Sequence, residues 1–555
     1  MTPNRAIGVI VGLIVLAGSR YTGEDTTGCA FAQAPPPPPP GETPNAPPPR
    51  PDQEQPEVLT RGPVHEAFAE PVTLQAQAGL VIPNQPPADI EEIPPDDRPQ
   101  GDHFVWVPGY WSWDADRSDF VWISACWRVA PPGMYWVPGY WAPVAAEPGG
   151  VNVAVGGVGV HVGGGVDVQV GPGVGVHVGG GHPEPAGVAG WEWVAGFWAP
   201  VAAEEIEYLP APPAPFDLAP PGAPPAADNI WVPGCWYWLD GQYVRRPGYW
   251  LRQQPDWVWE PSHYRWSPRG YVFEEGHWDY SLDRRGVLFA PVYFPQSIYS
   301  RAGFSYSPSI AIDIGLLSAN LFISPRYNHY YFGDYYDDAY TREGIYPQFE
   351  TERYHTWYDP IYNYDRWHYG EKDKHWEENR RQEYDHRLAD KNLRPARTYR
   401  DMEARVARMP EAQRRGAELA RPLATIAAGK TSPLKFEKIN TDGRQKITRQ
   451  AGDVHKFREE RGKWEAAGST NQRAERPPAE HKGAVTPAGE RSSGIVPPRE
   501  VHLKQPERVK IPSPPIVGKS GHEKGPPPRP ADEEKHKAEA KDTHKDSGKE
   551  SGKGK

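Results

Sequence analysis

The sequence predicts a mainly β fold, in which short tryptophan-rich β-hairpin repeats form an irregular antiparallel sheet body. Charged helices and long disordered tails follow this body. Three observations lead to this prediction: a six-residue tryptophan motif recurs over 106–278, valine runs alternate between glycines over 149–182, and proline and charged residues dominate the two ends. A single hairpin is marginal in water, so repeated hairpins have to pack on one another to be stable.

The motif places two tryptophans on either side of a Pro-Gly pair or a related pair. Proline presets φ at the first central position of a type II turn, and glycine accepts the positive φ of the second position. We therefore expect each motif to reverse the chain and to set its own two tryptophans side by side. The positions assigned to this structural repeat are Trp106, Pro108, Gly109, Trp111, Trp122, Trp127, Trp136, Pro138, Gly139, Trp141, Trp193, Gly196, Trp198, Trp231, Pro233, Gly234, Trp236 and Trp250.

At these residues the chain resembles the tryptophan-rich WxxGxW (YXWGXW) repeat family of exported bacterial proteins. The resemblance covers about 106–141, 191–204 and 231–278, and it implies an envelope or secreted location but no activity. Ala125 stands where the family has glycine, and no proline precedes it, so that turn is expected to be of another type. Because tryptophan is usually well buried, we expect the repeated rings to form the core. The alternative is a row of exposed rings that stack on sugars.

The N-terminus has the pattern of an export signal. Arg5 precedes an apolar run over 6–17, and Ala30-Phe-Ala32 fits a cleavage site, which predicts a signal peptide over 1–32. A second interpretation takes Thr26-Thr-Gly-Cys29 as a degenerate lipobox with Cys29 lipidated. Both interpretations predict a periplasmic, cell-envelope or extracellular protein, with membrane attachment only through an uncleaved signal or a lipidated Cys29.

Composition suggests where the remaining segments begin and end. The chain has 67 prolines and 56 glycines in 555 residues, which indicates that much of it does not pack. The valine runs over 148–187 alternate with period two between glycine turns and predict a small meander. The predicted segments are a mostly disordered Pro-rich linker (33–100), repeat block 1 (101–147), a Gly/Val-rich meander insertion (148–187), a single repeat plus Pro/Ala linker (188–228), repeat block 2 (229–280), apolar strands and a Tyr-rich segment (281–369), charged helices (370–420) and a disordered Pro/Lys/Glu-rich tail (421–555).

Two cysteines remain after cleavage of the predicted signal. Cys126 and Cys235 each stand directly before the closing tryptophan of a motif, and equivalent positions of stacked repeats can face each other. We therefore predict a possible disulfide between them. His161 and His177 in the valine runs are the weak metal candidates, and a solvated face explains them better. The sequence thus predicts no metal site and no cofactor.

Sequence motifs give no support for an enzyme. The chain has no G-x-S-x-G, H-E-x-x-H, Walker loop, paired C-x-x-C or recognisable cysteine–histidine constellation. We expect a non-catalytic, exported cell-envelope repeat protein with a structural, scaffolding or adhesive role. The alternative is binding of polysaccharide or cell-wall glycan through exposed Trp and Tyr rings. Partners would be cell-wall polysaccharide or other envelope proteins, and no nucleic acid, because the aromatic block is acidic and export removes that partner.

Overall fold

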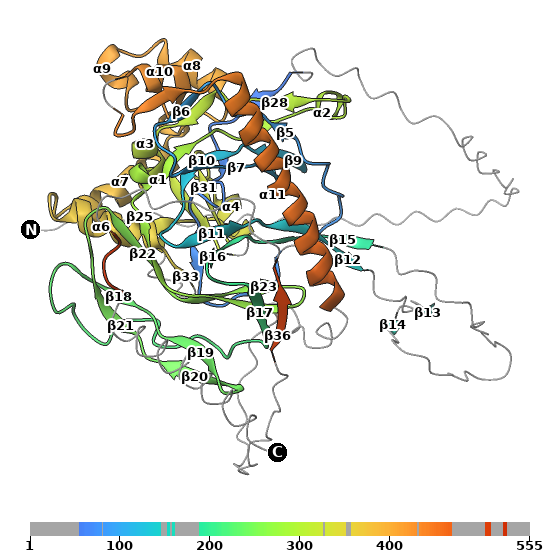
Figure 1. Cartoon of the computed structure of the whole chain (residues 1–555). Helices are drawn as coiled ribbons and strands as arrows, with labels where there is room; N and C mark the ends of the chain where they lie inside the picture. Colours follow the sequence, from blue (N-terminus) through green and yellow to red (C-terminus); the bar gives the residue numbers. More distant parts are fainter. Residues whose placement is uncertain are drawn as a thin grey trace, which may run out of the picture. The chain divides into compact units, whose positions relative to one another are not determined.

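A computed structural model describes residues 55–79, 81–145, 188–325, 328–350, 357–429, 432–468, 506–511 and 525–529, and the backbone of 153–155 and 158–160. All of them belong to one compact unit, Pro51–Lys555. As predicted, strand residues outnumber helical ones, the sheets are small and mostly antiparallel, and helices follow later in the chain (Figure 1). The predicted signal peptide, including Cys29, lies outside the described residues.

Four modules of one design form the tryptophan-rich part of the fold. Each module is a two-stranded antiparallel ribbon whose two strands are both interrupted once, which divides it into an outer and an inner strand pair. Module 1 consists of β7 (Phe104–Val107), β8 (Tyr110–Asp114), β9 (Asp119–Ile123) and β10 (Cys126–Val129). Module 2 consists of β11 (Met134–Val137), β12 (Tyr140–Ala145), β15 (Val188–Val194) and β16 (Phe197–Pro200). Module 3 consists of β18 (Asn229–Val232), β19 (Cys235–Leu239), β20 (Gln242–Arg246) and β21 (Tyr249–Arg252). Module 4 consists of β22 (Trp257–Glu260), β23 (His263–Ser267), β24 (Gly270–Glu274) and β25 (His277–Tyr280).

The interruption in each strand coincides with the Pro-Gly or equivalent position, and the register continues across it. In module 1, Trp106 faces Trp127 in the outer pair and Trp111 faces Trp122 in the inner pair. The chain reverses instead at the tip of the inner pair. In module 3 this tip is Asp240-Gly241, where both residues have positive φ (50° and 80°), as in a type I′ hairpin turn. The Pro-Gly positions are therefore bends within a ribbon, and the prediction that they are hairpin turns is wrong.

The segment before module 1 is part of the core, so the predicted linker over 33–100 is wrong from residue 55 onward. Its strands are β1 (Glu57–Val58), β2 (Gly62–Pro63), β3 (Val72–Thr73), β4 (Val81–Ile82), β5 (Glu91–Glu92) and β6 (Asp97–Pro99). Prolines keep these strands to two or three residues, yet each strand pairs with a strand from later in the chain. Val64, Phe68 and Ile90 between them are buried. The prediction failed because the high proline content of this segment indicated a linker, although a few well-spaced apolar residues in it are buried.

Short strands and helices after module 4 complete the body. The strands are β26 (Gly286–Leu288), β27 (Val292–Tyr293), β28 (Ser305–Tyr306), β29 (Ile310–Ile312), β30 (Leu321–Ser324), β31 (His329–Phe332), β32 (Tyr346–Pro347), β33 (Trp357–Tyr358), β34 (Ala420–Pro422) and β35 (Phe436–Lys438). The helices are α1 (Leu282–Arg285), α2 (Gln296–Tyr299), α3 (Ile314–Ser318), α4 (Asp338–Glu343), η2 (Gln348–Glu350), α6 (Pro360–Gly370), α7 (Trp376–Ala389), η3 (Lys391–Leu393), α8 (Tyr399–Val406), α9 (Glu411–Arg414), α10 (Leu423–Ala428) and α11 (Thr441–Gly468). The apolar strands predicted over 281–369 pack against the tryptophans, as Leu288, Ile312 and Ile323 share a buried cluster with Trp136 and Trp198.

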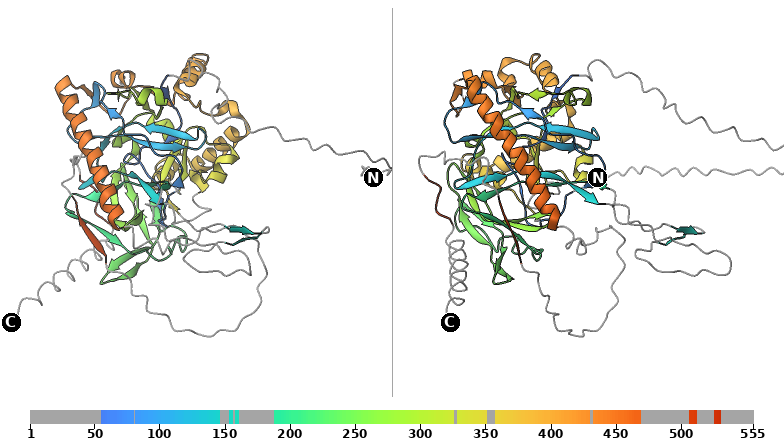
Figure 2. Two further views of the ribbon diagram at one scale, coloured as in Figure 1. Left: turned by 90° about the vertical axis from the view of Figure 1, so that its right-hand side faces the viewer. Right: turned by 45° about the vertical axis from the view of Figure 1, so that its right-hand side comes forward.

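The predicted disordered tail over 421–555 also requires correction. Its longest element is α11, a 28-residue helix that lies against one side of the strand body in both views of Figure 2 and buries Ala451, Val454 and Phe457. A later strand, β36 (Glu507–Lys510), pairs with β17 (Glu205–Leu209). These elements were missed because their charged residues outnumber the few apolar ones that face the core. No helix in the described part of the chain has the length and apolar character needed to cross a bilayer.

The predicted meander over 148–187 falls mostly outside the described residues. Within it, β13 (Val153–Val155) and β14 (Val158–Val160) form an antiparallel pair. The insertion joins β12 to β15, so it occupies the hairpin tip of module 2. His161 and His177 lie outside the described residues.

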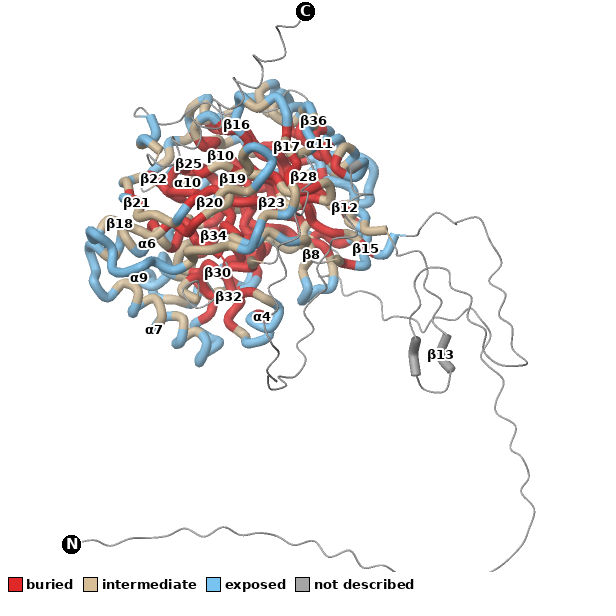
Figure 3. The backbone as a smooth tube through the Cα atoms, turned by 90° about the horizontal axis from the view of Figure 1, so that it is seen from below, coloured by how far each residue is buried: buried red, intermediate tan, exposed pale blue. Residues whose placement is uncertain are grey.

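The modules meet through side chains rather than through one continuous sheet. Among the described strands, no sheet contains strands of two modules. Contacts between rings connect them instead: Tyr110 of module 1 stacks on Trp193 of module 2, with ring centroids 4.9 Å apart, and Tyr237 of module 3 lies 5.1 Å from Phe273 of module 4. Figure 3 shows the buried residues gathered in the strands and the exposed ones in outer helices such as α7 and α9.

Candidate functional site: the paired tryptophan motifs

The tryptophans pair across each module, between two different copies of the motif. The ring centroids lie 5.0 Å apart for Trp106–Trp127, 5.2 Å for Trp111–Trp122, 5.1 Å for Trp136–Trp198, 5.4 Å for Trp141–Trp193, 5.3 Å for Trp231–Trp250 and 5.0 Å for Trp259–Trp278. All six pairs are edge-to-face, the geometry that aromatic quadrupoles favour. One motif thus forms half of a module. In modules 1 and 2 both of its tryptophans pair with tryptophans of the other half, and in modules 3 and 4 one of them does.

The glycine of the motif makes room for an indole ring. Gly109, Gly139, Gly196 and Gly234 do not have positive φ, so the predicted type II turn is wrong. A Cβ atom on Gly139 would lie 2.6 Å from Cζ2 of Trp193, and one on Gly196 would overlap Trp136. The opposite copy's first tryptophan therefore covers the glycine. Ala125 keeps its methyl group at the equivalent position of module 1 and is fully buried.

Buried carboxylates bind peptide N–H groups at the strand breaks. Glu92 accepts hydrogen bonds from the peptide N–H groups of Gly109 (2.8 Å) and Ala125 (3.0 Å), the two breaks of module 1. Glu66 accepts from the peptide N–H of Gly196 (2.9 Å) and from the indole N–H of Trp193 in module 2. Burial raises the pKa of Glu92 to about 7. Both glutamates come from the segment predicted to be a linker, and no local pattern there marks them as buried.

Arginines of α11 bind carbonyl oxygens at the same breaks. Arg461 donates to the carbonyl oxygens of Pro138 (2.9 Å) and Ala195 (3.0 Å), the two breaks of module 2. Arg458, one helical turn earlier, donates to the carbonyl oxygen of Gly109 (3.1 Å). Each break frees a backbone N–H and a backbone C=O from the ladder, and buried backbone groups need partners. Modules 1 and 2 therefore depend on residues outside the repeat.

Module 3 departs from this pattern. Its inner pair sets Trp236 opposite Arg245 instead of a second tryptophan. The ring that covers Gly234 is Phe216, which precedes the module in the chain. Trp231, Trp236 and Trp250 are only half-buried, whereas Trp106, Trp111, Trp122 and Trp127 of module 1 are at most 2% exposed. Module 3 is thus the copy in which all three motif tryptophans are half-buried.

The predicted disulfide does not form. Cys126 is a free thiol in the largest hydrophobic cluster, and burial raises its pKa. Cys235 lies on half-buried β19 in module 3, where its Sγ lies 3.5 Å from the carbonyl oxygen of Trp236. Equivalent positions in the sequence do not face each other, because the modules pack through their rings and not in a regular stack.

The interior also holds ion pairs that the sequence did not reveal. Arg128 and Arg285 both bind Asp279, and Arg285 also lies 3.3 Å from Glu260. Nearby, Arg265 pairs with Glu70 and with Glu274 at 3.1 Å. All these side chains are buried, and they connect module 1, module 4 and the N-terminal segment. Such networks fix which strands meet, since an unpaired charge in this interior is costly.

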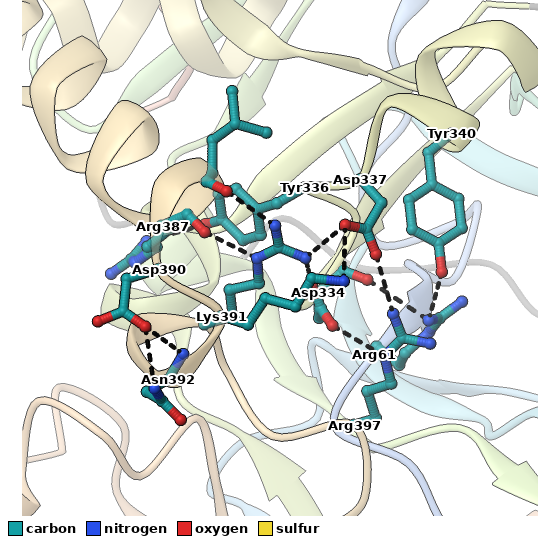
Figure 4. A network of polar contacts seen from close by, with 12 residues as sticks. Arg61, Asp334, Tyr336, Asp337, Tyr340, Arg387, Asp390, Lys391, Asn392 and Arg397 are labelled. Atoms are coloured by element: carbon teal, nitrogen blue, oxygen red, sulfur yellow. Dashed lines mark hydrogen bonds and ion pairs between the residues drawn. The ribbon is translucent and has the colours of Figure 1, made fainter.

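A pocket of about 820 Å³ opens between η3, α8 and the loop after β31. Its walls carry Lys391, Arg394, Arg397, Asp334 and Asp337 (Figure 4). Arg394 donates to Asp337 at 2.8 Å, and Arg397 donates to Asp334 at 2.8 Å. Arg394 and Arg397 are therefore paired with aspartates, and Arg405 and Arg408 also line the pocket. Within the described ranges, no group of three or more His, Cys, Asp or Glu side chains is placed to hold a metal ion.

The geometry shows motifs that pair two by two within a module. A comparison of the sequence with protein families finds the same repeat. A family model described as the WXXGXW repeat (2 copies) matches residues 101–128, 230–250 and 255–279, which correspond to modules 1, 3 and 4. The chain therefore carries the WXXGXW repeats that its sequence predicted. Module 2 has the same pairing, although it lies outside the matched segments. No curated protein and no solved structure matched the chain.

Proposed function

We propose that the chain is a non-catalytic structural protein of the cell envelope, a rigid body that serves as a scaffold or adhesive element. The observation that carries this proposal is the pairing of the motif tryptophans inside the modules. A ring that fills the gap over a glycine and packs edge-to-face on a second ring is part of the core and does not offer its face to a ligand. The buried carboxylates Glu66 and Glu92 of the N-terminal segment bind strand breaks and not an open cleft.

Export belongs to the same proposal and rests on the N-terminal sequence. The experiment is to express the full chain with its own N-terminus, fractionate the cells and determine the mature N-terminus by mass spectrometry. We expect the protein in the envelope fraction, beginning at Gln33 or at a lipidated Cys29. Chemical crosslinking in the intact envelope then identifies the neighbours. An uncleaved chain in the cytoplasm would contradict the location, and turnover of a substrate would contradict the absence of catalysis.

Glycan binding is the second candidate, and the half-exposed rings of module 3 favour it. Trp238 and Tyr243 lie opposite each other on the inner pair, with centroids 4.8 Å apart. Sugars stack on rings of this kind. Insoluble cell-wall glycan should then retain the full chain and protect part of its tryptophan fluorescence from iodide. Trp238→Ala should reduce retention, and Trp113→Ala on half-buried β8 is the matched control. Equal retention of the two variants would exclude module 3 as a glycan site.

A further inference from the structure

Three of the four modules hold a proline-containing segment through an indole N–H group. Trp111 donates to the carbonyl oxygen of Ala88 (2.9 Å), which follows Pro86-Pro87. Trp278 donates to the carbonyl oxygen of Pro528 (3.3 Å), the last of three consecutive prolines. Module 3 makes the most such contacts. The recurrence indicates that the indole N–H edge of a motif tryptophan is suited to this kind of chain.

In module 3 the bound segment is Pro210-Ala-Pro-Pro-Ala-Pro-Phe-Asp217, which we call the strap. Tyr243 donates to the carbonyl oxygen of Pro210 (2.5 Å), Trp236 to that of Ala214 (3.0 Å) and Trp231 to that of Asp217 (2.9 Å). A proline-rich chain lacks most N–H donors and stays extended, so its carbonyl oxygens are what a partner can bind. Aromatic surfaces that donate to such carbonyls are a general means of recognising proline-rich peptides.

One side chain of the strap fits a gap that the repeat itself leaves. In modules 1 and 2 the first tryptophan of the opposite copy covers the glycine, but in module 3 that position is Arg245. The Phe216 ring enters over Gly234 and lies 4.8 Å from the Trp236 ring. Arg245 lies 4.1 Å from the centre of the Phe216 ring and binds Asp217 at 2.9 Å. Module 3 therefore binds a proline-rich segment that ends in an aromatic residue followed by an acidic one.

The strap is held only lightly by the rest of the fold. Its residues are half-buried or exposed, and its single ladder contact is the isolated bridge from Phe216 to Gly234. The following residues, 219–227, are all exposed and connect it to β18. Segments with few buried contacts open at low free-energy cost, and exposed connectors permit exchange of an element between copies. Because the strap is covalently linked to module 3, its local concentration there is on the order of millimolar. A strap from a second copy competes only when the concentration of the protein is similarly high.

We propose that module 3 is a docking site for an extended, proline-rich segment that carries an aromatic residue, and that the strap of a second copy of this chain occupies it in trans. Copies would then link through one another's straps. This inference goes beyond the packing role proposed above and does not depend on the cellular location.

The test measures binding of a labelled synthetic peptide with the sequence of residues 208–219 to the full chain. Phe216→Ala combined with Asp217→Ala weakens the chain's own strap without altering the donors of module 3. We expect this strap-weakened chain to bind the peptide at least about tenfold more tightly than the unmodified chain, because the tethered competitor is lost. Adding Trp236→Phe or Tyr243→Phe should weaken binding about fivefold each, the factor that one net hydrogen bond contributes. Adding Trp113→Phe, in module 1, should have no effect.

Two further readouts complete the test. A peptide with its four prolines replaced by alanine should bind more weakly. Without the prolines it is less extended before binding and loses more conformational entropy when it binds. Sedimentation of the unmodified chain at high concentration should show dimers that the peptide dissociates and that the strap-weakened chain does not form. The proposal is overturned if the strap-weakened chain keeps its near-ultraviolet dichroism but does not bind the peptide. It is also overturned if the donor variants bind as well as their parent, if the alanine peptide binds equally, or if dimers persist without a functional strap.

Discussion

The glycine of each WxxGxW motif acts through the space it leaves and not through its conformational freedom. Gly196 has an ordinary φ, but the Trp136 ring and the carbonyl oxygen of Val137 lie against the position that a Cβ would take. The spacing of the motif thus allows two copies to fit together. The glycine of one copy leaves a gap, and a tryptophan ring of the other copy fills it. A single copy could not show this, because the partner of each ring lies in another copy of the motif: the separation along the chain is shortest for Trp111–Trp122 and longest for Trp136–Trp198.

Gly196→Ala should destabilise the fold, because the methyl group has to displace a packed indole. Overpacking of this kind costs about 1–3 kcal/mol, and we expect the upper part of that range since backbone also borders the site. Thermal unfolding monitored by near-ultraviolet dichroism measures the change. Gly222→Ala is the control, because nothing lies within 4 Å of its added methyl group. Equal unfolding midpoints for the two variants would contradict the proposed fit.

Glu92 should make stability depend on pH. Its pKa is about 7 in the folded chain, raised by burial, against a usual 4.5. Between these values the unfolded chain has released the proton and the folded chain has not, so the free energy of unfolding falls as pH rises from about 4.5 to 7. Glu92→Gln should remove up to about 3 kcal/mol of that fall. Urea unfolding across this pH range measures it, with Glu91→Gln at the exposed neighbour as control. Parallel pH profiles for the wild type and Glu92→Gln would show that this carboxyl does not titrate there.

Helix α11 depends on a few buried polar residues for its position. Glu465 accepts hydrogen bonds from Arg461 (2.9 Å), from Tyr140 of module 2 (2.7 Å) and from Tyr208 of β17 (2.9 Å). The Arg461 and Glu465 side chains are 1% and 0% exposed. The helix has no strong apolar face, so these contacts and a short row of apolar residues anchor it to modules 1 and 2.

Arg461→Leu should release the second half of α11 from module 2. The substitution leaves Glu465 buried without its cation and leaves two backbone carbonyls without a donor, which costs about 3–5 kcal/mol. Hydrogen exchange of the amides over 441–468 should accelerate by at least about a hundredfold, since about 2.7 kcal/mol corresponds to that factor. Lys463→Leu, two residues away and exposed, should leave the exchange unchanged. Protection of α11 in Arg461→Leu would mean that the apolar contacts suffice.

The whole body depends on the N-terminal segment from residue 55. A chain that begins at residue 101 keeps every repeat but loses Glu66, Glu92, Phe68 and the strands β1 to β6. We expect it to expose apolar surface, bind a hydrophobic dye and unfold without a cooperative transition, because buried strand breaks then lack acceptors. A chain that begins at residue 55 should unfold cooperatively. A cooperative transition in the shorter chain would show that the modules fold without this segment.

The sequence by itself determined the β class, the repeat, the burial of most motif tryptophans and the presence of charged helices after residue 370. These properties follow from local features of the sequence, namely its composition and the spacing of its motifs. Only the tertiary structure decided that the Pro-Gly positions are bends, that Trp106 pairs with Trp127 and not with Trp111, and that Cys126 stays unbonded. It also decided that proline-rich 55–100 and charged α11 belong to the core. The reason is physical: the partners of a freed backbone group or of a ring lie far away in the chain, and no local pattern records which distant residue satisfies them.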